Sequence, residues 1–231
     1  MQEEKWFHLK IDRINWLTSG YLILDLKLSS QFHFEAGQYT MFRLKDDQGF
    51  FDCYYSIASY PLVEGPLQFC ILPRGRSLPV YKSLKIGDEI CLASPRGDFR
   101  LNNNHLPKIF IAGGSGISPL KSMIDGMYAL GEAKEKVHLV YGCQQSEAMP
   151  FQKDFEKMKK NSSFTFKTWY CAQESTSSLV AEGLVTDFIE PSFIKGAEYY
   201  VSGPPPMVQA VETFLKNHFH VPSESINTER Y

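Results

Sequence analysis

A glycine-rich turn between a predicted strand and a predicted helix constrains this chain more than any other feature. The apolar run Ile109–Ala112 is typical of a buried strand, and it leads directly into Gly113, Gly114, Ser115 and Gly116. Such a turn presents backbone N–H groups and the positive end of a helix to an anion. A dinucleotide pyrophosphate is the usual occupant, so the turn predicts a dinucleotide-binding unit.

The residues that follow this turn predict a helix, and a second, similar turn is predicted later in the chain. Ser118 is expected to be the N-cap and Pro119 the first residue of a helix that ends at Gly131. Later in the chain another strand runs into a second turn, made of Ser202, Gly203, Pro204, Pro205, Pro206 and Met207. Two turns of this kind predict two walls of one crevice.

The rhythm of apolar segments changes near Asn102–His105, a polar stretch that we interpret as a linker between domains 1–102 and 106–231. The first domain predicts a six-stranded antiparallel β-barrel, because short strands alternate with turns. The second alternates strands with helices, which predicts an α/β fold with a doubly wound parallel sheet.

The expected elements are as follows. In the first domain the strands are 21–28, 39–44, 54–58, 67–72 and 89–93, with a helix over 79–84. In the second the strands are 109–112, 137–141, 164–170 and 199–202, and the helices are 119–130, 149–159, 179–188 and 206–219.

Composition excludes several classes of protein. The 24 Lys and Arg residues nearly balance the 26 Asp and Glu residues, so no basic surface predicts a nucleic acid or membrane partner. Apolar runs have the length of strands, and the charged N-terminus lacks a secretion signal, so we expect a cytoplasmic location. Five scattered cysteines without a CxxC motif predict buried thiols, with no disulfide, zinc or iron–sulfur site.

Five groups of residues, in this order, resemble motifs of the ferredoxin–NADP reductase superfamily. Ala36–Tyr39 is similar to AGQY, and Tyr55–Ser59 resembles the flavin motif RxYS. Gly75–Ser77, followed by Gly87–Asp88 and Pro95–Phe99, resembles the phosphate loop and barrel closure. Gly113–Pro119 resembles GGTGIAP, and Ser202–Met207 resembles CGPPPM. The resemblance spans almost the whole chain. It implies that residues 1–102 bind FAD, with FMN as the alternative, and that residues 106–231 bind NADH or NADPH.

The resemblance also implies roles for single residues. Ser56 would lie within hydrogen-bond reach of flavin N5, Ser202 near the nicotinamide, and Tyr231 stacked on the flavin, although a disordered tail is the alternative for Tyr231. The implied cofactor-binding residues are Cys53, Tyr54, Tyr55, Ser56, Ile57, Arg74, Gly75, Arg76, Ser77, Gly113, Gly114, Ser115, Gly116, Ser118, Pro119, Gln144, Gly203, Pro204, Pro205 and Met207.

Three positions depart from the family pattern. Cys53 replaces the arginine that grips flavin phosphate, which leaves Arg74, Arg76 or Arg96 to compensate. Ser202 replaces a cysteine near the nicotinamide. Gln144 stands where relatives often carry an arginine, which favours NADH over NADPH.

The resemblance therefore implies a flavin-dependent NAD(P)H oxidoreductase. It would pass hydride from NAD(P)H to bound FAD, and then electrons to a separate acceptor, such as a ferredoxin-like protein or an oxygenase component. Two alternatives stay open: a diffusible flavin reductase that acts on free flavin, and a non-catalytic electron-transfer subunit.

Overall fold

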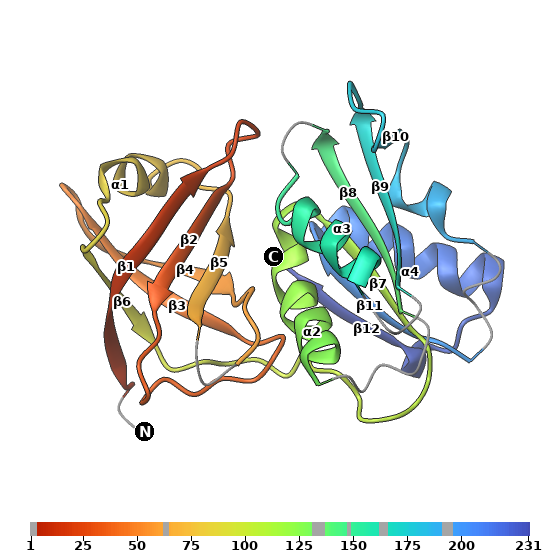
Figure 1. The fold of residues 1–231 in the computed structure, drawn as a ribbon, viewed down its shortest axis with the longest axis horizontal. Helices are drawn as coiled ribbons and strands as arrows, with labels where there is room; N and C mark the ends of the chain where they lie inside the picture. Colours follow the sequence, from red (N-terminus) through yellow and green to blue (C-terminus); the bar gives the residue numbers. More distant parts are fainter. Residues whose placement is uncertain (1–3, 62–64, 131–136, 147–148, 162–165, 191–195) are drawn as a thin grey trace.

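The computed structural model describes residues 4–61, 65–130, 137–146, 149–161, 166–190 and 196–231. Figure 1 shows two lobes side by side: a barrel lobe of antiparallel strands, and an α/β lobe in which helices cover both faces of a parallel sheet. The C-terminus lies between the lobes. The predicted fold class, an antiparallel six-stranded unit followed by a parallel α/β unit, is confirmed.

The barrel lobe closes around its own apolar core. Its strands are β1 (Trp6–Trp16), β2 (Leu22–Lys27), β3 (Tyr39–Asp46), β4 (Gly49–Ser56), β5 (Pro66–Ile71) and β6 (Glu89–Ala93), in the spatial order β4-β3-β6-β1-β2-β5. A bridge between Ile57 and Phe69 carries the end of β4 back to β5. Helix α1 (Ser77–Ser83) follows β5. The sequence reasoning missed β1, although its buried Phe7, Leu9 and Ile11 alternate as a strand requires.

The α/β lobe is built on one parallel sheet. Its strands are β7 (Lys108–Gly113), β8 (Val137–Gln145), β9 (Phe166–Glu174), β10 (Ala181–Glu182), β11 (Glu198–Gly203) and β12 (Ile226–Arg230), in the order β10-β9-β8-β7-β11-β12. Helices α2 (Ile117–Ala129) and α3 (Gln152–Asn161) pack on one face, and α4 (Pro205–Phe219) packs on the other. Strand order reverses at β7, so the carboxyl ends of β7 and β11 form a topological switch point.

Two local predictions in this lobe are wrong. Residues 179–188 do not form a helix: Gly183, at φ +145°, separates the short strand β10 from a 3-10 turn, Val185–Phe188. Ser118 is not the N-cap of α2, because the 3-10 turn Gly114–Gly116 runs straight into that helix and Gly116 takes the cap position. The Ser118 hydroxyl instead donates to the Ser115 carbonyl at 2.9 Å. Gly131, the predicted helix end, lies outside the described residues.

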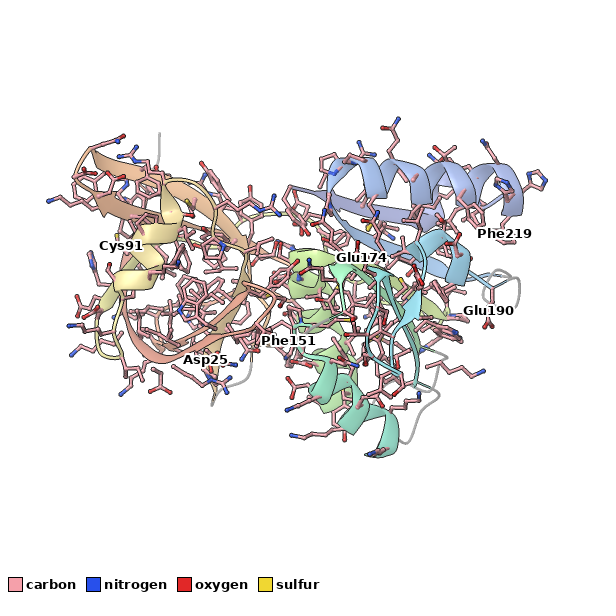
Figure 2. All side chains as sticks on the ribbon, turned by 90° about the horizontal axis from the view of Figure 1, so that it is seen from above. Asp25, Cys91, Phe151, Glu174, Glu190 and Phe219 are labelled. Carbon is pink, nitrogen blue, oxygen red and sulfur yellow. The ribbon has the colours of Figure 1, made fainter. Side chains whose placement is uncertain are left out.

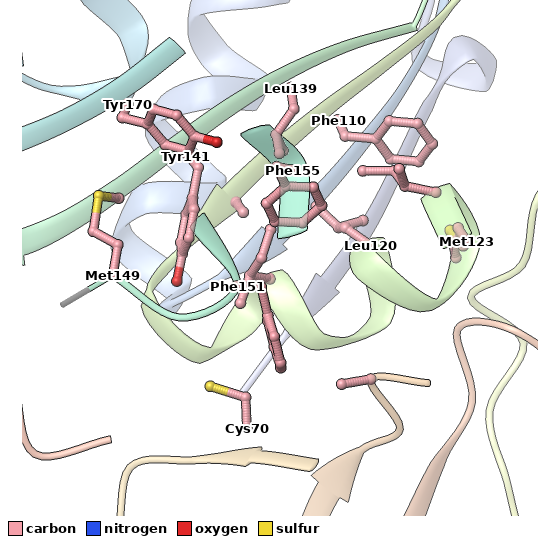
Figure 3. Close-up of a cluster of buried hydrophobic side chains, with 14 of the residues drawn as sticks. Cys70, Phe110, Leu120, Met123, Leu139, Tyr141, Met149, Phe151, Phe155 and Tyr170 are labelled. Carbon is pink, nitrogen blue, oxygen red and sulfur yellow. The ribbon is translucent and has the colours of Figure 1, made fainter. Parts of the chain in front are cut away.

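One hydrophobic cluster crosses from lobe to lobe. The barrel residues Ile23, Ala58 and Cys70 pack in the same buried cluster as α2 and the strands β7–β9. Figure 3 shows Cys70 below Phe151, and Figure 2 places Phe151 where the two lobes meet. Burial of this shared apolar surface holds the lobes together. Within the described residues, no helix has the length and apolar character needed to cross a bilayer.

A buried charge pair anchors the linker to the α/β lobe. Lys108 Nζ donates to Glu198 Oε2 at 2.6 Å, and Asn102 Nδ2 and Asn104 Nδ2 each donate to Glu198 Oε1 at 2.8 Å. Burial opposes ionisation of Glu198, but these hydrogen bonds outweigh it and lower its pKa. The carboxylate therefore ties the linker residues to β7 and β11.

This pair gives a first prediction. Lys108→Met leaves the Glu198 carboxylate buried without a counter-charge, so we expect the free energy of unfolding to fall by about 3–5 kcal/mol. The double variant Lys108→Met, Glu198→Met removes both charges and should recover most of the loss. Urea denaturation measures both variants, and a single variant as stable as the wild type would contradict the prediction.

Candidate nucleotide and redox site

A cavity of about 870 Å³ lies between the lobes. The barrel contributes the end of β4 and the loop after β5, and the α/β lobe contributes the carboxyl ends of its parallel strands and the start of α4. Crevices at such strand ends are the usual ligand sites of open parallel sheets. The volume is in the range of small-molecule and cofactor sites.

The two predicted glycine turns meet at the switch point and form one wall of this cavity. Strands β7 and β11 pair in parallel, with Ala112 opposite Ser202. A Cβ atom at Gly116 would stand 2.3 Å from the Ser202 carbonyl oxygen, and one at Gly113 would stand 2.3 Å from the Met207 sulfur. Glycine is therefore the residue that lets the two turns approach each other.

Aromatic and hydroxyl groups form the barrel wall. Tyr55 turns toward the barrel core, where its ring lies 5.2 Å from Phe42 in an edge-on contact. Tyr54, which leaves the opposite face of β4, is 59% exposed and also lines the cavity. Ser56 ends the strand beside them. Both tyrosines line the same cavity, although neighbouring side chains leave opposite faces of a strand.

A carboxyl group that the sequence reasoning missed lies next to this wall. Glu229 on β12 is the register partner of Ser202 on β11, and the Ser56 hydroxyl donates to Glu229 Oε2 at 3.1 Å. Burial raises the pKa of Glu229 to about 7, while the hydroxyls of Ser56 and Ser202 act to lower it. The Ser202 hydroxyl is buried, and among the described groups none meets the distance and angle of a hydrogen bond to it.

Glu229 also lines a second, open groove of about 450 Å³, together with Tyr39, Phe99, Arg100 and Arg230. The carboxyl group therefore stands between the Ser56 hydroxyl and a route to solvent. A group with a pKa near 7 in that position can take up or release a proton at neutral pH.

The terminal residue lies at the first glycine turn. The Tyr231 hydroxyl donates to the Gly113 carbonyl at 2.6 Å and accepts from the Gly116 amide at 2.5 Å. Burial raises the pKa of this phenol to about 12, so it stays protonated at neutral pH. Tyr21, from the loop before β2, reaches the same turn: a Cβ at Gly114 would stand 2.8 Å from its hydroxyl.

Many of the predicted site residues line the cavity, and others do not contact it. Those on the wall are Tyr54, Tyr55, Ser56, Arg74, Gly113, Gly114, Ser115, Ser118, Gln144, Pro204, Met207 and Tyr231. Those that do not line it are Cys53, Ile57, Gly75, Arg76, Ser77, Gly116, Pro119, Ser202, Gly203 and Pro205. Gly116 and Ser202 still shape the wall, because they set the contact between its two turns.

The sequence did not predict Glu229 or Tyr21 as site residues, and the reason differs between the two. Glu229 belongs to Ile226–Arg230, a short strand whose only sequence signal is a pair of β-branched residues, and no strand was predicted there. Tyr21 was assigned to a strand, although it lies in the loop before β2. No local pattern marks either residue as part of the site, because each acts through a partner distant in sequence.

Metal-ligating groups do not gather in the described part of the chain: no three His, Cys, Asp or Glu side chains are placed to hold a metal ion. The five cysteines, all within that part, are free. Burial raises the pKa of Cys143, on the cavity wall, to about 11, which disfavours its reactive thiolate at neutral pH.

The pKa of Glu229 predicts how stability depends on pH. The folded chain keeps this carboxyl protonated up to about pH 7, whereas the unfolded chain ionises it near its ordinary value of 4.5. The folded state holds the extra proton in that window, so its stability falls as pH rises from 4.5 to 7, by on the order of 1–3 kcal/mol.

Glu229→Gln should remove this component of the pH dependence, and the exposed control Glu224→Gln should retain it. Urea denaturation of each protein across this pH window measures the effect. Parallel stability curves for the Glu229→Gln variant and the wild type would show that the prediction is wrong.

Comparison with known proteins extends this description. Residues 110–213 match the family model of the oxidoreductase NAD-binding domain. The chain is 30% identical to the toluate 1,2-dioxygenase electron transfer component of Pseudomonas putida, over 93% of this chain and 64% of that protein. It is also 30% identical to the propane 2-monooxygenase reductase component of Rhodococcus jostii, over 90% of this chain and 59% of that protein. It thus spans less than two thirds of either relative.

Solved structures share the two-lobed fold. The cytochrome P450 reductase of Amycolatopsis superposes with a TM-score of 0.86 at 21% identity, covering 99% of this chain and 71% of that one. A ferredoxin NADP+ reductase from Neisseria gonorrhoeae, with bound FAD and NADP, superposes with a TM-score of 0.82 at 17% identity and covers 99% of both chains.

Proposed function

We propose that the chain is an FAD- and NAD-binding oxidoreductase of the superfamily that includes the ferredoxin–NADP reductases, and that it transfers hydride from NAD(P)H to bound FAD and then passes electrons to a separate acceptor. The observation that carries this proposal is the cavity between the lobes. In it, two contacting glycine turns face a wall of tyrosines that ends at the Ser56–Glu229 hydrogen bond.

The residues present fit a flavin dinucleotide. FAD needs an apolar contact surface and a few polar groups near the reactive ring atoms, and Tyr54, Tyr55 and Ser56 offer both on one strand end. Ser202, a buried hydroxyl without a hydrogen-bond partner among the described groups, lies just behind the wall. In the proposal residues 1–102 hold FAD, with FMN as the alternative, and residues 106–231 hold the nicotinamide dinucleotide at the glycine turns.

Bound FAD supplies chemistry that side chains lack, because it accepts electrons in pairs and releases them singly. The chain's own residues position the reactants and manage protons. Glu229, with a pKa of about 7, accepts a hydrogen bond from the Ser56 hydroxyl at Oε2, and its carboxyl group can take up or release a proton through the open groove. Holding donor and acceptor in one cavity replaces a bimolecular encounter by a preorganised contact.

Tyr231 in the proposal is a displaceable occupant of the nucleotide site. Its hydroxyl engages the Gly116 amide at the turn that we assign to the pyrophosphate. Binding of the nicotinamide dinucleotide therefore requires this tyrosine to leave its two hydrogen bonds at the turn.

The wall near the ends of β8 and β9 supports NADH as the preferred donor. Gln144, Gln145 and Gln173 line the cavity there, and all three are neutral. A ribose 2′-phosphate would find no cation among these residues, whereas neutral amides suit a ribose hydroxyl. NADPH remains the competing donor in any test.

The acceptor in the proposal is a protein, either ferredoxin-like or an oxygenase component. Its support is that the two relatives compared above are an electron transfer component of a dioxygenase and a reductase component of a monooxygenase. Free flavin is the alternative acceptor. The donor NAD(P)H is a product of cytoplasmic metabolism, so the proposal includes a cytoplasmic location.

The direct test is anaerobic addition of NADH to the FAD-loaded chain. We expect the visible flavin absorbance to disappear, and NADPH to act more slowly. Ser56→Ala removes the hydroxyl that bonds Glu229 and should slow the reduction by about tenfold. The control Ser83→Ala, which removes an exposed hydroxyl that donates to Val80, should not change the rate. A chain that binds no flavin, or whose flavin NADH cannot reduce, would refute the proposal.

The position of Tyr231 gives a separate prediction. Tyr231→Phe keeps the ring but removes the hydroxyl that competes for the Gly116 amide. We expect it to tighten NAD+ binding by about tenfold, as Tyr231→Ser should, because two hydrogen bonds no longer have to break. Calorimetric titration measures both variants. If only Tyr231→Ser tightens binding, the ring and not the hydroxyl is the competitor.

A further inference from the structure

The arginine that the flavin motif leads one to expect is missing, and residue 53 cannot replace it. Cys53 is partly buried and packs against the apolar core of the barrel lobe. It does not line the cavity between the lobes. A dinucleotide pyrophosphate carries negative charge, and a charged hydrogen bond is a strong part of its binding. Another cation must supply that contact if the barrel holds FAD.

Two of the three arginines that could compensate are already engaged elsewhere. Arg76 donates to both carboxylate oxygens of Asp46, donates to the Gly49 carbonyl at 3.1 Å, and stacks over the Phe51 ring at 4.4 Å. Arg96 forms an ion pair with Glu4. Neither residue lines the cavity. Both would have to abandon native partners to reach a ligand there.

Arg74 differs from both. Its side chain is exposed and lines the cavity, and among the described residues it has no ion pair and donates no side-chain hydrogen bond. The rest of the described wall carries no Lys, Asp, Glu or His, so Arg74 is its one charged side chain. An unpaired cation on an otherwise neutral wall is a ready site for an anion.

The backbone around Arg74 is held in place. The Ser77 hydroxyl donates to the Arg74 carbonyl at 3.0 Å, the Ser77 amide donates to the same carbonyl at 3.2 Å, and the Arg74 amide donates to the Ser77 hydroxyl at 3.3 Å. Gly75 adopts φ +52°, the left-handed conformation that such a turn requires. The hydroxyl of Ser77 therefore fixes the loop that presents the guanidinium, which lowers the entropic cost of binding.

From these observations we infer that Arg74 takes over the role of the missing arginine and binds the pyrophosphate of FAD. The inference rests on the proposed function. Arg74 belongs to the barrel lobe, on the loop between β5 and α1, whereas the α/β lobe has its own glycine-turn amides for the second pyrophosphate. A planar guanidinium suits a phosphate diester because it can donate two parallel hydrogen bonds.

The experiment compares three flavins that differ in phosphate content. The flavin-free full chain, its Arg74→Gln variant and the control Lys82→Gln, which removes an exposed cation of α1 outside the cavity, are titrated with FAD, FMN and riboflavin, and binding is followed by quenching of flavin fluorescence. We expect Arg74→Gln to weaken FAD binding by tenfold or more and to leave riboflavin binding within twofold. Arg74→Lys keeps the charge but not the bidentate geometry, so it should lose less. Lys82→Gln should leave FAD binding unchanged.

The outcomes separate this inference from the proposed function. If the wild type binds none of the flavins, the proposed function itself fails. If the wild type binds FAD and Arg74→Gln binds it equally well, only the role of Arg74 is refuted. Equal weakening for riboflavin and FAD would refute it as well, since riboflavin has no phosphate. A loss confined to NAD+ in a parallel titration would assign Arg74 to the other dinucleotide and overturn the inference.

Discussion

The close contact between strands β7 and β11 is the constraint on which the site depends. At the ends of these parallel strands the backbone of Gly116 lies so near the Ser202 carbonyl that no side chain fits between them. This contact brings two turns from distant parts of the chain into one wall. It also fixes β12, which pairs with β11 and so places Glu229 beside Ser202. The positions of the two glycine turns and of the Glu229 carboxyl group therefore all follow from the pairing of β11 with β7 and with β12.

The second wall depends on burial of apolar surface between the lobes. Ile23, Ala58 and Cys70 from the barrel share a cluster with α2, which holds Ser56 within reach of Glu229 across the interface. The same packing brings Tyr21 to the glycine turn. A hydrogen bond between residues 173 positions apart has a defined length only because hydrophobic contacts elsewhere fix the two lobes against each other.

Few charged side chains lie in or near the cavity, so each polar group there has a distinct role. Burial raises the pKa of Glu229 to about 7, so this carboxyl group is about half protonated at pH 7, while the hydroxyls of Ser56 and Ser202 act to lower the pKa. On the cavity wall, Arg74 is the one charged side chain among the described residues. A neutral cavity with a single cation suits large, mostly apolar ligands that carry a localised negative charge. The proposed flavin and nicotinamide dinucleotides have that character.

The local sequence determined those features of the fold that depend on interactions between residues close together in the chain. The buried strand and glycines at 109–116, the proline-opened helix α4, the alternation in the α/β lobe and the antiparallel nature of the barrel follow from periodicity and backbone preference. Tertiary structure decided where α2 begins: the 3-10 turn runs into the helix, so Gly116 and not Ser118 is the N-cap. It also decided which arginine remained unpaired and which carboxyl met Ser56. Those outcomes depend on strand order and on packing between lobes, and the energies that set them come from residues far apart in the chain, which no local pattern can encode.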